Sequence, residues 1–568
     1  MVTANNQCGL IRRILSALLL LAVACLPVFS QTVHPSSSAT TRKSYTGNSS
    51  YTIAGTVVNA STGEPVRHAT VAALSEEDSH IVATAESSEN GHFTLEGLAA
   101  AKYQLTASKR GFRTAFYDEH DDFSTAIVTG PGQETDSLVF RLTPEATLRG
   151  VVTTEGGDPV EGANVILFRR PRANEPGGRI VHMNDTSTDD TGAYEFNGLA
   201  AGEYLLAVKA DPWYALHRGS DRASAVSVDG PADATNANAA LDVAYPVTFF
   251  DATTEETTAT AIALAGGSRE EANIMLHAVP ALHLSVETPH KQDGSIAPTE
   301  LRQTVFGAEI PGDVTHYLGG GMQLGTTELT GIAPGHYELT QGDPPRIAQL
   351  DATTSQQIDP TLGTPAVTVS GTLRNGSGSP LPGQIELQLT ALDGAHQAVS
   401  VPCVRGAFSF QAIAHGTWEL AVQSAGGAQL PVVSIAMGNR AHPGNQIAVG
   451  ERALSLVVTV NETATRIEGF AQKAGKGVAG VMILLVPKVL TGLESLARRD
   501  QTDSDGSFSL RDAVPGQYTV VAIEGGWELD WSRPEVIGRY LPGGIPVTVT
   551  GSSGRILILS SPVPVESR

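Results

Sequence analysis

An internal repeat at fixed spacing constrains the fold of this chain more than any other feature. Twelve residues before each of five aromatic anchors stands a glycine, and two residues after that glycine four of the five copies have a second aromatic residue, the third copy having Thr327. A glycine also stands two residues before every anchor except the first, where Ala101 replaces it. Matches at the same offsets indicate copies of one supersecondary unit. The anchors are Tyr103, Tyr204, Tyr337, Trp418 and Tyr518.

Each copy has the composition of short strands separated by turns. Its opening reads as a strand and a glycine-proline turn, as in "IAGTVVNASTGEPV" (53–66) and "LRGVVTTEGGDPV" (148–160). A second strand follows, as in "ANVILF" (163–168) and "VMILLV" (481–486), and we expect these strands to be half-buried. The glycine after an acidic or amide residue, as in "DDTG", supplies the positive φ of a hairpin turn.

The two aromatic positions are best explained as core. We expect the aromatic after the turn and the anchor to lie on neighbouring strands, with both side chains directed into one core. Each ring would bury ~150–250 Å². The anchor hydroxyl would reach a backbone group, and the glycine before the anchor would let the chain turn sharply.

A chain of 568 residues exceeds the roughly 250–300 residues that one core supports, so several domains are expected. The sequence predicts an all-β protein: a tandem array of about five Ig-like or transthyretin-like antiparallel β-sandwiches after a signal peptide. A short helix is expected within 489–499. The expected boundaries are 1–30 (signal peptide), 31–48 (linker), 49–145, 146–280 with an insert at about 217–242, 281–364 (a degenerate copy, either decayed or specialised), 365–461 and 462–568.

The N-terminus has the pattern of a secretory signal. Arg12 and Arg13 precede the apolar run "ILSALLLLAVACLPVF", and cleavage is expected after Ser30. Lipidation at Cys25 is an alternative, which the apolar residues just after it disfavour. The mature chain is expected to have no membrane span and to keep one cysteine, Cys403, so no intramolecular disulfide can form.

The motifs together resemble a known family. The strand and turn of 151–168, followed by "TDDTGAYEFNGLAAGEYLLAV" (188–208), resemble the carboxypeptidase regulatory-like domain, a transthyretin-like β-sandwich that is also classed near carbohydrate-binding-like folds. Copies one, two and five match well, copy four moderately and copy three poorly. The resemblance implies the fold more than an activity, because function resides in sites on folds.

The sequence offers little that points to catalysis. The net charge of −22 disfavours nucleic acid as a partner. The 15 histidines show no zinc-ligand spacing, and no nucleophile elbow or phosphate loop is present. Acidic turns such as "TDSDG" (502–506) offer two or three oxygens each, whereas Ca²⁺ takes six to eight, so turn chemistry is favoured. We therefore expect no enzyme, no metal and no cofactor.

Aromatic residues just after the anchor strand are the candidate binding residues. Nine residues after an anchor stand Phe112, Trp213 and Trp527, in "KRGF", "DPWY" and "GGWELDW". Such rings could stack on a sugar or a peptide, or they could cover the open end of the sandwich, which we favour. If a ligand binds, the candidate residues are Phe112, Trp213, Tyr214, Trp527 and Trp531.

The expected function is non-enzymatic. The sequence predicts a secreted, periplasmic or envelope-associated bacterial protein that binds or scaffolds, with adhesion as a role and carbohydrate as the leading ligand class because of the fold resemblance. An accessory subunit that docks onto another envelope protein is the alternative. A hydrolase with an unrecognised site is the third hypothesis.

Overall fold

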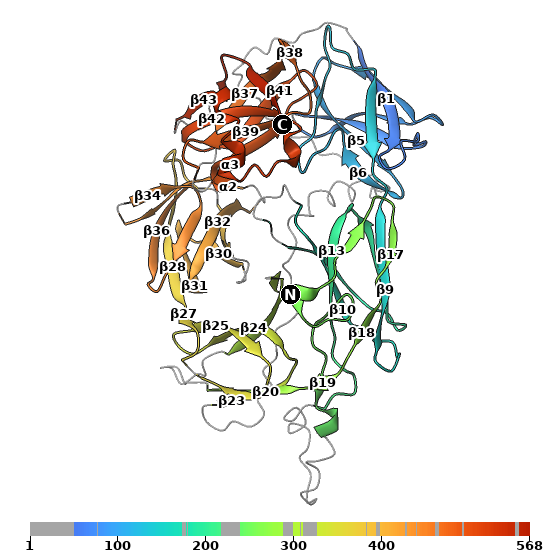
Figure 1. Cartoon of the computed structure of the whole chain (residues 1–568). Helices are drawn as coiled ribbons and strands as arrows, with labels where there is room; N and C mark the ends of the chain where they lie inside the picture. Colours follow the sequence, from blue (N-terminus) through green and yellow to red (C-terminus); the bar gives the residue numbers. More distant parts are fainter. Residues whose placement is uncertain are drawn as a thin grey trace, which may run out of the picture. The chain divides into compact units, whose positions relative to one another are not determined.

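The strands pair within five consecutive segments of the chain, which we call repeats 1 to 5. Their strands span 51–142, 146–280, 282–365, 367–460 and 465–567 (Figure 1). The expected signal peptide, the linker at 31–48 and residues 217–238 of the expected insert lie outside the described residues, and the domain boundaries stay predictions. The computed structural model describes residues 50–568 except 77, 173–177, 179, 217–238, 288–298, 307, 310–325, 360, 382, 393–397, 426–428, 439, 461–464, 491–492 and 551–555.

Repeat 1 is a sandwich of two sheets. One sheet has the order β4-β1-β8, and the other has the order β3-β2-β5-β6 with β7 also paired to β5. Side chains from both sheets, including Phe93 and Tyr103, form one core. The strands are β1 (Tyr51–Asn59), β2 (Thr70–Ser75), β3 (Ile81–Glu86), β4 (His92–Leu98), β5 (Lys102–Lys109), β6 (Phe112–Phe116), β7 (Ile127–Val128) and β8 (Leu138–Leu142).

Repeat 2 has the same plan with shorter closing strands. Its sheets have the orders β12-β9-β17 and β11-β10-β13-β15; β18 also pairs with β9, β16 pairs with β13, and β14 pairs with β19. The elements are β9 (Ala146–Thr154), β10 (Asn164–Arg169), β11 (Val181–Ser187), β12 (Ala193–Leu199), β13 (Gly202–Lys209), η3 (Ala239–Leu241), β14 (Val243–Ala244), β15 (Thr248–Phe249), η4 (Glu256–Thr258), β16 (Ile262–Leu264), β17 (Arg269–Glu271), β18 (Ile274–Leu276) and β19 (Val279–Pro280).

Repeat 3, the degenerate copy in sequence, still forms two sheets. They have the orders β23-β20-β26 and β22-β21-β24-β25-β27. Its core includes Leu284, Leu301, Tyr337 and Leu339. The strands are β20 (Leu282–Glu287), β21 (Glu300–Val305), β22 (Ala308–Glu309), β23 (Thr326–Ile332), β24 (Gly335–Gln341), β25 (Arg346–Ala352), β26 (Gln356–Ile358) and β27 (Thr364–Pro365).

Repeat 4 consists of two sheets of similar size. They have the orders β31-β28-β36-β33-β34 and β30-β29-β32-β35, and Trp418, Phe408 and Phe410 lie in the core between them. The strands are β28 (Val367–Asn375), β29 (Ile385–Ala391), β30 (Val399–Cys403), β31 (Ala407–Ile413), β32 (Gly416–Ser424), β33 (Val432–Met437), β34 (Arg440–Pro443), β35 (Gln446–Val449) and β36 (Leu454–Val460).

In repeat 5 the last strand joins the two sheets into one. β45 pairs in parallel with both β37 and β42, and helical turns follow β42. The expected helix within 489–499 is a single turn, α2. The elements are β37 (Thr465–Lys473), β38 (Lys476–Gly477), β39 (Met482–Pro487), α2 (Leu493–Leu496), β40 (Arg498–Gln501), β41 (Ser507–Ala513), β42 (Gly516–Glu524), η5 (Gly526–Glu528), α3 (Pro534–Ile537), η6 (Leu541–Gly543), β43 (Ile545–Val549), β44 (Ile556–Ile558) and β45 (Val563–Ser567).

One pairing pattern recurs in all five repeats. The first strand pairs antiparallel with the strand that follows the glycine turn, as β1 does with β4 and β28 with β31. The same first strand pairs in parallel with a strand from the end of its repeat, as β1 does with β8 and β28 with β36. The structure therefore confirms the all-β class and the tandem β-sandwich architecture.

The two aromatic positions face each other across the sandwich, which corrects the expectation that their strands are neighbours. Phe93 lies on β4 and Tyr103 on β5, and these strands belong to opposite sheets. The turn before β4 likewise connects strands of different sheets, β3 and β4, so it is a crossover and not a hairpin. Its glycine has the expected positive φ, for example 73° at Gly91 and 74° at Gly192.

Every anchor donates a hydrogen bond to the carbonyl oxygen four residues before it. Four are tyrosine hydroxyls, and the indole Nε1 of Trp418 makes the same bond to Ala414 over 3.0 Å. The predicted bond from the anchor to the backbone is thus confirmed, and because its acceptor is local, each repeat satisfies its own anchor. The tyrosine bonds are Tyr103–Ala99 (3.2 Å), Tyr204–Ala200 (2.9 Å), Tyr337–Ala333 (2.7 Å) and Tyr518–Val514 (2.9 Å).

The glycine before the anchor is explained by packing against the anchor ring more than by a sharp turn. Of the four glycines, Gly416 alone has a positive φ, 148°. A Cβ on Gly516 would lie 3.0 Å from Cε2 of Tyr518, and one on Gly202 would lie 3.6 Å from Cε2 of Tyr204. Because glycine has no side chain, it leaves the space that the anchor ring occupies.

Two second strands are buried on both faces, so the prediction that they are half-buried is wrong. The residues of β39 are all buried, and β10 is buried at its four central positions. The outer face of β10 packs against Val305 and Phe306 of repeat 3, and that of β39 packs against Trp527 and its neighbours. Continuous apolar runs such as "VMILLV" are typical of strands covered on both sides.

Candidate binding cavity between repeats 1 and 5

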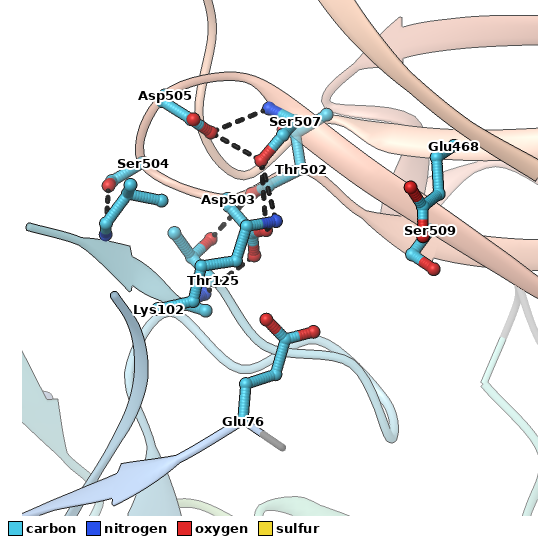
Figure 2. Close-up of polar contacts among 12 residues, drawn as sticks. Glu76, Lys102, Thr125, Glu468, Thr502, Asp503, Ser504, Asp505, Ser507 and Ser509 are labelled. Atoms are coloured by element: carbon cyan, nitrogen blue, oxygen red, sulfur yellow. Dashed lines mark hydrogen bonds and ion pairs between the residues drawn. The ribbon is translucent and has the colours of Figure 1, made fainter. Parts of the chain in front are cut away.

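A loop of repeat 1 is buried against a turn of repeat 5. The loop joins β6 to β7, and its Thr125 and Ala126 are 2% and 3% exposed; Thr502 of repeat 5 is fully buried. The Ser504 amide donates to the Ala126 carbonyl over 2.9 Å, and the Val128 amide donates to Ser504 Oγ over 2.8 Å (Figure 2). Residues nearly 380 positions apart in the sequence thus share backbone hydrogen bonds.

An ion pair lies beside these backbone contacts. The Lys102 Nζ is 2.5 Å from Asp503 Oδ2 and donates to Ser507 Oγ over 2.9 Å (Figure 2). The other carboxylate oxygen, Oδ1, accepts the Ala126 amide over 3.2 Å. Burial raises the pKa of Asp503, and Lys102 opposes part of that rise. Burial alone would lower the pKa of Lys102, but the charge of Asp503 and its hydrogen bond, together with the charges of Glu76 and Asp505, outweigh burial and the pKa is raised.

Next to the ion pair, one arginine and two tryptophans of repeat 5 enclose a phenylalanine of repeat 1. Arg499 Cζ lies 5.3 Å from the ring centroid of Phe123, 5.7 Å from that of Trp527 and 5.1 Å from that of Trp531. Its Nη1 is 2.9 Å from Asp121 Oδ2. Cation–π contacts strengthen as they are desolvated, so this cluster stabilises the junction.

Trp527 is fixed from several sides. Its ring stacks on His120 with centroids 5.3 Å apart and planes at 11°, and its Nε1 donates to the Gly480 carbonyl over 3.1 Å. Only 7% of Trp527 and 6% of Trp531 are exposed. Among the described residues, no acceptor lies within hydrogen-bond distance of the buried Nε1 of Trp531.

A cavity of about 560 Å³ opens at this junction. Repeat 1 contributes Glu76, Gln104 and Asp122 to its lining. Repeat 5 contributes both charge signs and an aromatic ring, from Arg498, Arg499, Asp500, Arg511 and Trp531. Its size and its mixture of charged, amide and aromatic groups suit a small polar ligand.

One acid in the lining has a strongly shifted pKa. Burial raises the pKa of Asp500 to about 7, although the amides of Ser509 and Gln501 favour its charged form. Its Oδ2 accepts the Ser509 amide over 2.5 Å. At neutral pH this carboxyl group can therefore both donate and accept a hydrogen bond.

The structure separates the five candidate aromatic residues. Trp527 and Trp531 lie together at the junction and are almost fully buried, and Trp531 lines the cavity. Phe112 begins β6, is half-buried against the core of repeat 1, and has Lys109 Nζ 5.7 Å from its centroid. Trp213 is 92% exposed, and its ring meets that of Tyr214 edge-on at 5.7 Å. Their role in binding stays a prediction.

The residues that complete the junction between repeats 1 and 5 were missed by the sequence reasoning. His120, Phe123 and Arg499 carry no motif, and each acquires its role only when two distant segments meet. Burial raises the pKa of the Cys403 thiol, which keeps it protonated at neutral pH. In the part of the chain that the structure describes, no cluster of three His, Cys, Asp or Glu side chains is placed to hold a metal ion.

Comparison with protein families places the first two repeats. Residues 52–143 and 147–242 match the family described as "Carboxypeptidase regulatory-like domain". Repeats 1 and 2 are carboxypeptidase regulatory-like domains. The matched residues of the regulatory-like domains include the anchors Tyr103 and Tyr204, and the residues from 243 onward lie beyond the match. The assignment of repeats 3 to 5 to the same family rests on their shared offsets and pairing pattern, and it stays a prediction.

Solved structures with distant similarity come from bacterial proteins. The TIE protein of Bacillus anthracis is 11% identical, with 74% of this chain and 76% of that chain covered and a TM-score of 0.16. A streptococcal ancillary pilin is 11% identical over 73% of this chain and 99% of that chain, with a TM-score of 0.16. Two B repeats of the collagen-binding protein of Staphylococcus aureus are 12% identical over 73% and 100%, with a TM-score of 0.13.

These values are too low to carry the function of a pilin or an adhesin over to a chain with two regulatory-like domains. No curated protein matches the chain at a significant level. None of the described helices is long and apolar enough to cross a membrane.

Proposed function

We propose that this chain is a secreted or envelope-associated bacterial protein that binds a carbohydrate and has no catalytic activity of its own. The observation that carries the proposal is the cavity of about 560 Å³ between a regulatory-like domain and repeat 5. Sugars present hydroxyl groups that both donate and accept. The cavity is lined by Gln104, Asp122 and Asp500, whose side chains can form hydrogen bonds with such hydroxyl groups.

A glycan array with the secreted form, residues 31–568, tests the proposal. The cavity variant combines Gln104→Ala with Asp122→Asn, since neither side chain makes a hydrogen bond or ion pair with another described residue. Trp213→Ala serves as the second variant, because it removes the exposed ring and leaves the cavity unchanged. We expect the wild type and Trp213→Ala to bind the same glycan and the cavity variant to lose it.

Other results would overturn parts of the proposal. Loss of binding in Trp213→Ala alone would move the site to the loop after β13 in repeat 2. Binding to no glycan would overturn the carbohydrate proposal and leave protein docking as the function to pursue. Cleavage of a glycan by the pure protein, abolished by Asp500→Asn, would overturn the non-enzymatic proposal in favour of a hydrolase.

A specific observation favours docking as the second candidate function. Two edge strands present large apolar side chains to solvent: Ile81 and Val82 on β3 are 49% and 41% exposed, and Val181 and Met183 on β11 are 39% and 46% exposed. An open edge of this kind accepts a strand from another protein. Capture of an envelope protein, lost when lysine replaces Val82 or Met183, would support the role of a docking subunit.

A further inference from the structure

The open side of the sandwich in repeat 1 carries a groove of about 480 Å³. It lies where the edge strands of the two sheets meet, β6 from one sheet and β8 from the other. Phe112 and Pro144 form a bridge there, and the Arg113 amide donates to the Thr143 carbonyl over 2.9 Å. The groove shares no lining residue with the cavity between repeats 1 and 5.

Two guanidinium groups in this groove lack a carboxylate partner. Arg113 and Arg141 are exposed, and neither forms an ion pair with a described residue. Both line the groove, Arg113 from β6 and Arg141 from β8.

The carboxylates in the same groove are already engaged. Asp118 accepts from the Thr125 hydroxyl over 3.1 Å, and Glu119 accepts the Phe116 amide over 2.8 Å. Asp121 is paired with Arg499 of repeat 5 at 2.9 Å and lies 3.8 Å from Arg172 of repeat 2. The groove is therefore lined by three arginines and three carboxylates, and Arg113 and Arg141 are the two arginines for which the described residues offer no carboxylate partner.

From this geometry we infer that the groove binds an acidic polysaccharide through its carboxylate groups. The arginine fork matches a carboxylate in two parallel hydrogen bonds, and two forks in one groove suit a polymer with repeated anionic groups. Thr114, Thr143 and the exposed Val139 also line the groove. A sugar ring offers both the hydroxyl groups and the C–H face that such a lining requires.

An acidic peptide fits this seam less well. Peptides that add to a sheet edge need free backbone groups along that edge. Here the Thr143 carbonyl accepts from Arg113, the Gly111 carbonyl accepts from Glu145, and the Val139 backbone bonds the Tyr117 side chain. These backbone groups of the seam are therefore not free to pair with a peptide, whereas its side chains are available for recognition.

Isothermal titration of the full chain with oligogalacturonate tests the inference. The methyl ester of the same oligomer is the matched ligand without charge, and inorganic phosphate is the isolated oxyanion. We expect binding of the acid and not of the ester. In Arg113→Gln/Arg141→Gln the Kd should rise roughly 10- to 100-fold, because two charge-assisted contacts are lost. Lysine at both positions should give an intermediate Kd, since the charge stays and the fork is lost.

The control variant is Arg440→Gln/Arg452→Gln. It removes the same charge from two exposed arginines of repeat 4, neither of which is paired with a described residue. It should bind as the wild type does. Equal loss in both double variants, equal binding of acid and ester, or no binding of the acid would overturn the inference. If phosphate binds as tightly as the oligomer, the groove is a site for simple oxyanions and the proposal of a saccharide ligand is wrong. The cavity variant Gln104→Ala/Asp122→Asn leaves this groove intact. Its glycan binding therefore tests the proposed function independently of the titration with oligogalacturonate, which tests the groove.

Discussion

Lys102 and Asp503, 401 residues apart in the sequence, form an ion pair with 2.5 Å between Nζ and Oδ2. Only 33% of the lysine side chain and 11% of the aspartate side chain are exposed. The pair lies next to the backbone hydrogen bonds through which repeats 1 and 5 are joined, so the two ends of the described chain depend on one another.

Removal of one member of this pair should loosen the junction. In Lys102→Met the carboxylate of Asp503 stays buried without its partner, which costs about 3 kcal/mol or more for a buried pair. We expect faster amide hydrogen exchange at Ser504 and Val128, whose hydrogen bonds cross the junction. Arg67→Met is the control, because Arg67 and Glu89 are 62% and 70% exposed and such pairs contribute roughly 0–1 kcal/mol. Equal exchange in both variants would contradict the prediction.

The stability of repeat 5 should depend on the protonation of Asp500. Its pKa is raised from 3.8 to about 7 by burial, so between these values the folded protein binds more protons than the unfolded chain. The contribution of Asp500 to the unfolding free energy is therefore fully present below about pH 4 and is lost as the pH rises through about 7.

Asp500→Asn removes this dependence while its amide oxygen can still accept the Ser509 amide. By calorimetry, the Tm of the variant minus that of the wild type should increase from pH 4 to pH 7 and then stay constant. A difference that does not change with pH would show that Asp500 is charged in the folded protein throughout. Asp503, whose pKa is also raised, is present in both proteins, and its charge contributes to the raised pKa of Asp500.

The bond from the anchor to the backbone can be tested in repeat 4, where tryptophan replaces tyrosine. Trp418→Tyr keeps a donor for the Ala414 carbonyl, whereas Trp418→Phe has the same ring size as tyrosine and no donor. The phenylalanine variant should be less stable than the tyrosine variant by about 1 kcal/mol, since a buried acceptor is left unpaired. Hydrogen exchange at β32 measures the difference, and equal protection would argue that packing alone fixes the anchor.

The turn glycines should differ in their tolerance of a side chain. A Cβ on Gly192 (φ 74°) would lie 2.4 Å from the Val152 carbonyl oxygen, whereas one on Gly157 (φ 85°) would meet nothing within 4 Å. Gly157→Ala should cost about 1–2 kcal/mol, from the left-handed backbone alone. Gly192→Ala should cost more, because backbone atoms must also move. Similar losses in thermal unfolding would mean that the crossover has room to relax.

The two candidate tryptophans Trp213 and Trp527 should differ in how much their replacement destabilises the protein. Trp213→Ala should change the unfolding free energy by less than about 0.5 kcal/mol, as exposed positions do. Trp527→Ala should cost about 3–5 kcal/mol, because its ring is buried and its Nε1 is bonded. A double variant of both tryptophans would therefore confuse loss of binding with loss of structure, and Trp213→Ala alone tests the exposed loop.

The sequence predicts well what is decided within one repeat. The anchor, its glycine and its bond to the backbone lie within a few residues of one another, so spacing alone indicates them. The exposure of the post-strand aromatics is decided elsewhere. Phe112, Trp213 and Trp527 share one offset, yet they are half-buried, 92% exposed and 7% exposed. Trp527 is covered by His120 and Phe123, which a pattern local to repeat 5 cannot reveal.

The sequence also could not predict which strands belong to the same sheet and which lie on opposite sheets. Strand alternation shows that Phe93 and Tyr103 point into a core, but it does not distinguish adjacent strands from strands on opposite sheets. The apolar run of β39 did contain the missing information. Its unbroken hydrophobicity indicates cover on both sides, although not which residues supply it.

The contact between Lys102 and Asp503 also affects the order in which parts of the chain would unfold under a force applied to its two ends. Tension applied at Tyr51 and Ser567 passes through repeat 1, across the junction and into repeat 5. While the junction holds, it provides a shorter path for this load than the chain through repeats 2, 3 and 4. When it opens, the 401-residue span between the two charges is released at once. The junction should therefore break before the three sandwiches between its two sides are stretched, and it protects them from unfolding at forces below its own rupture force.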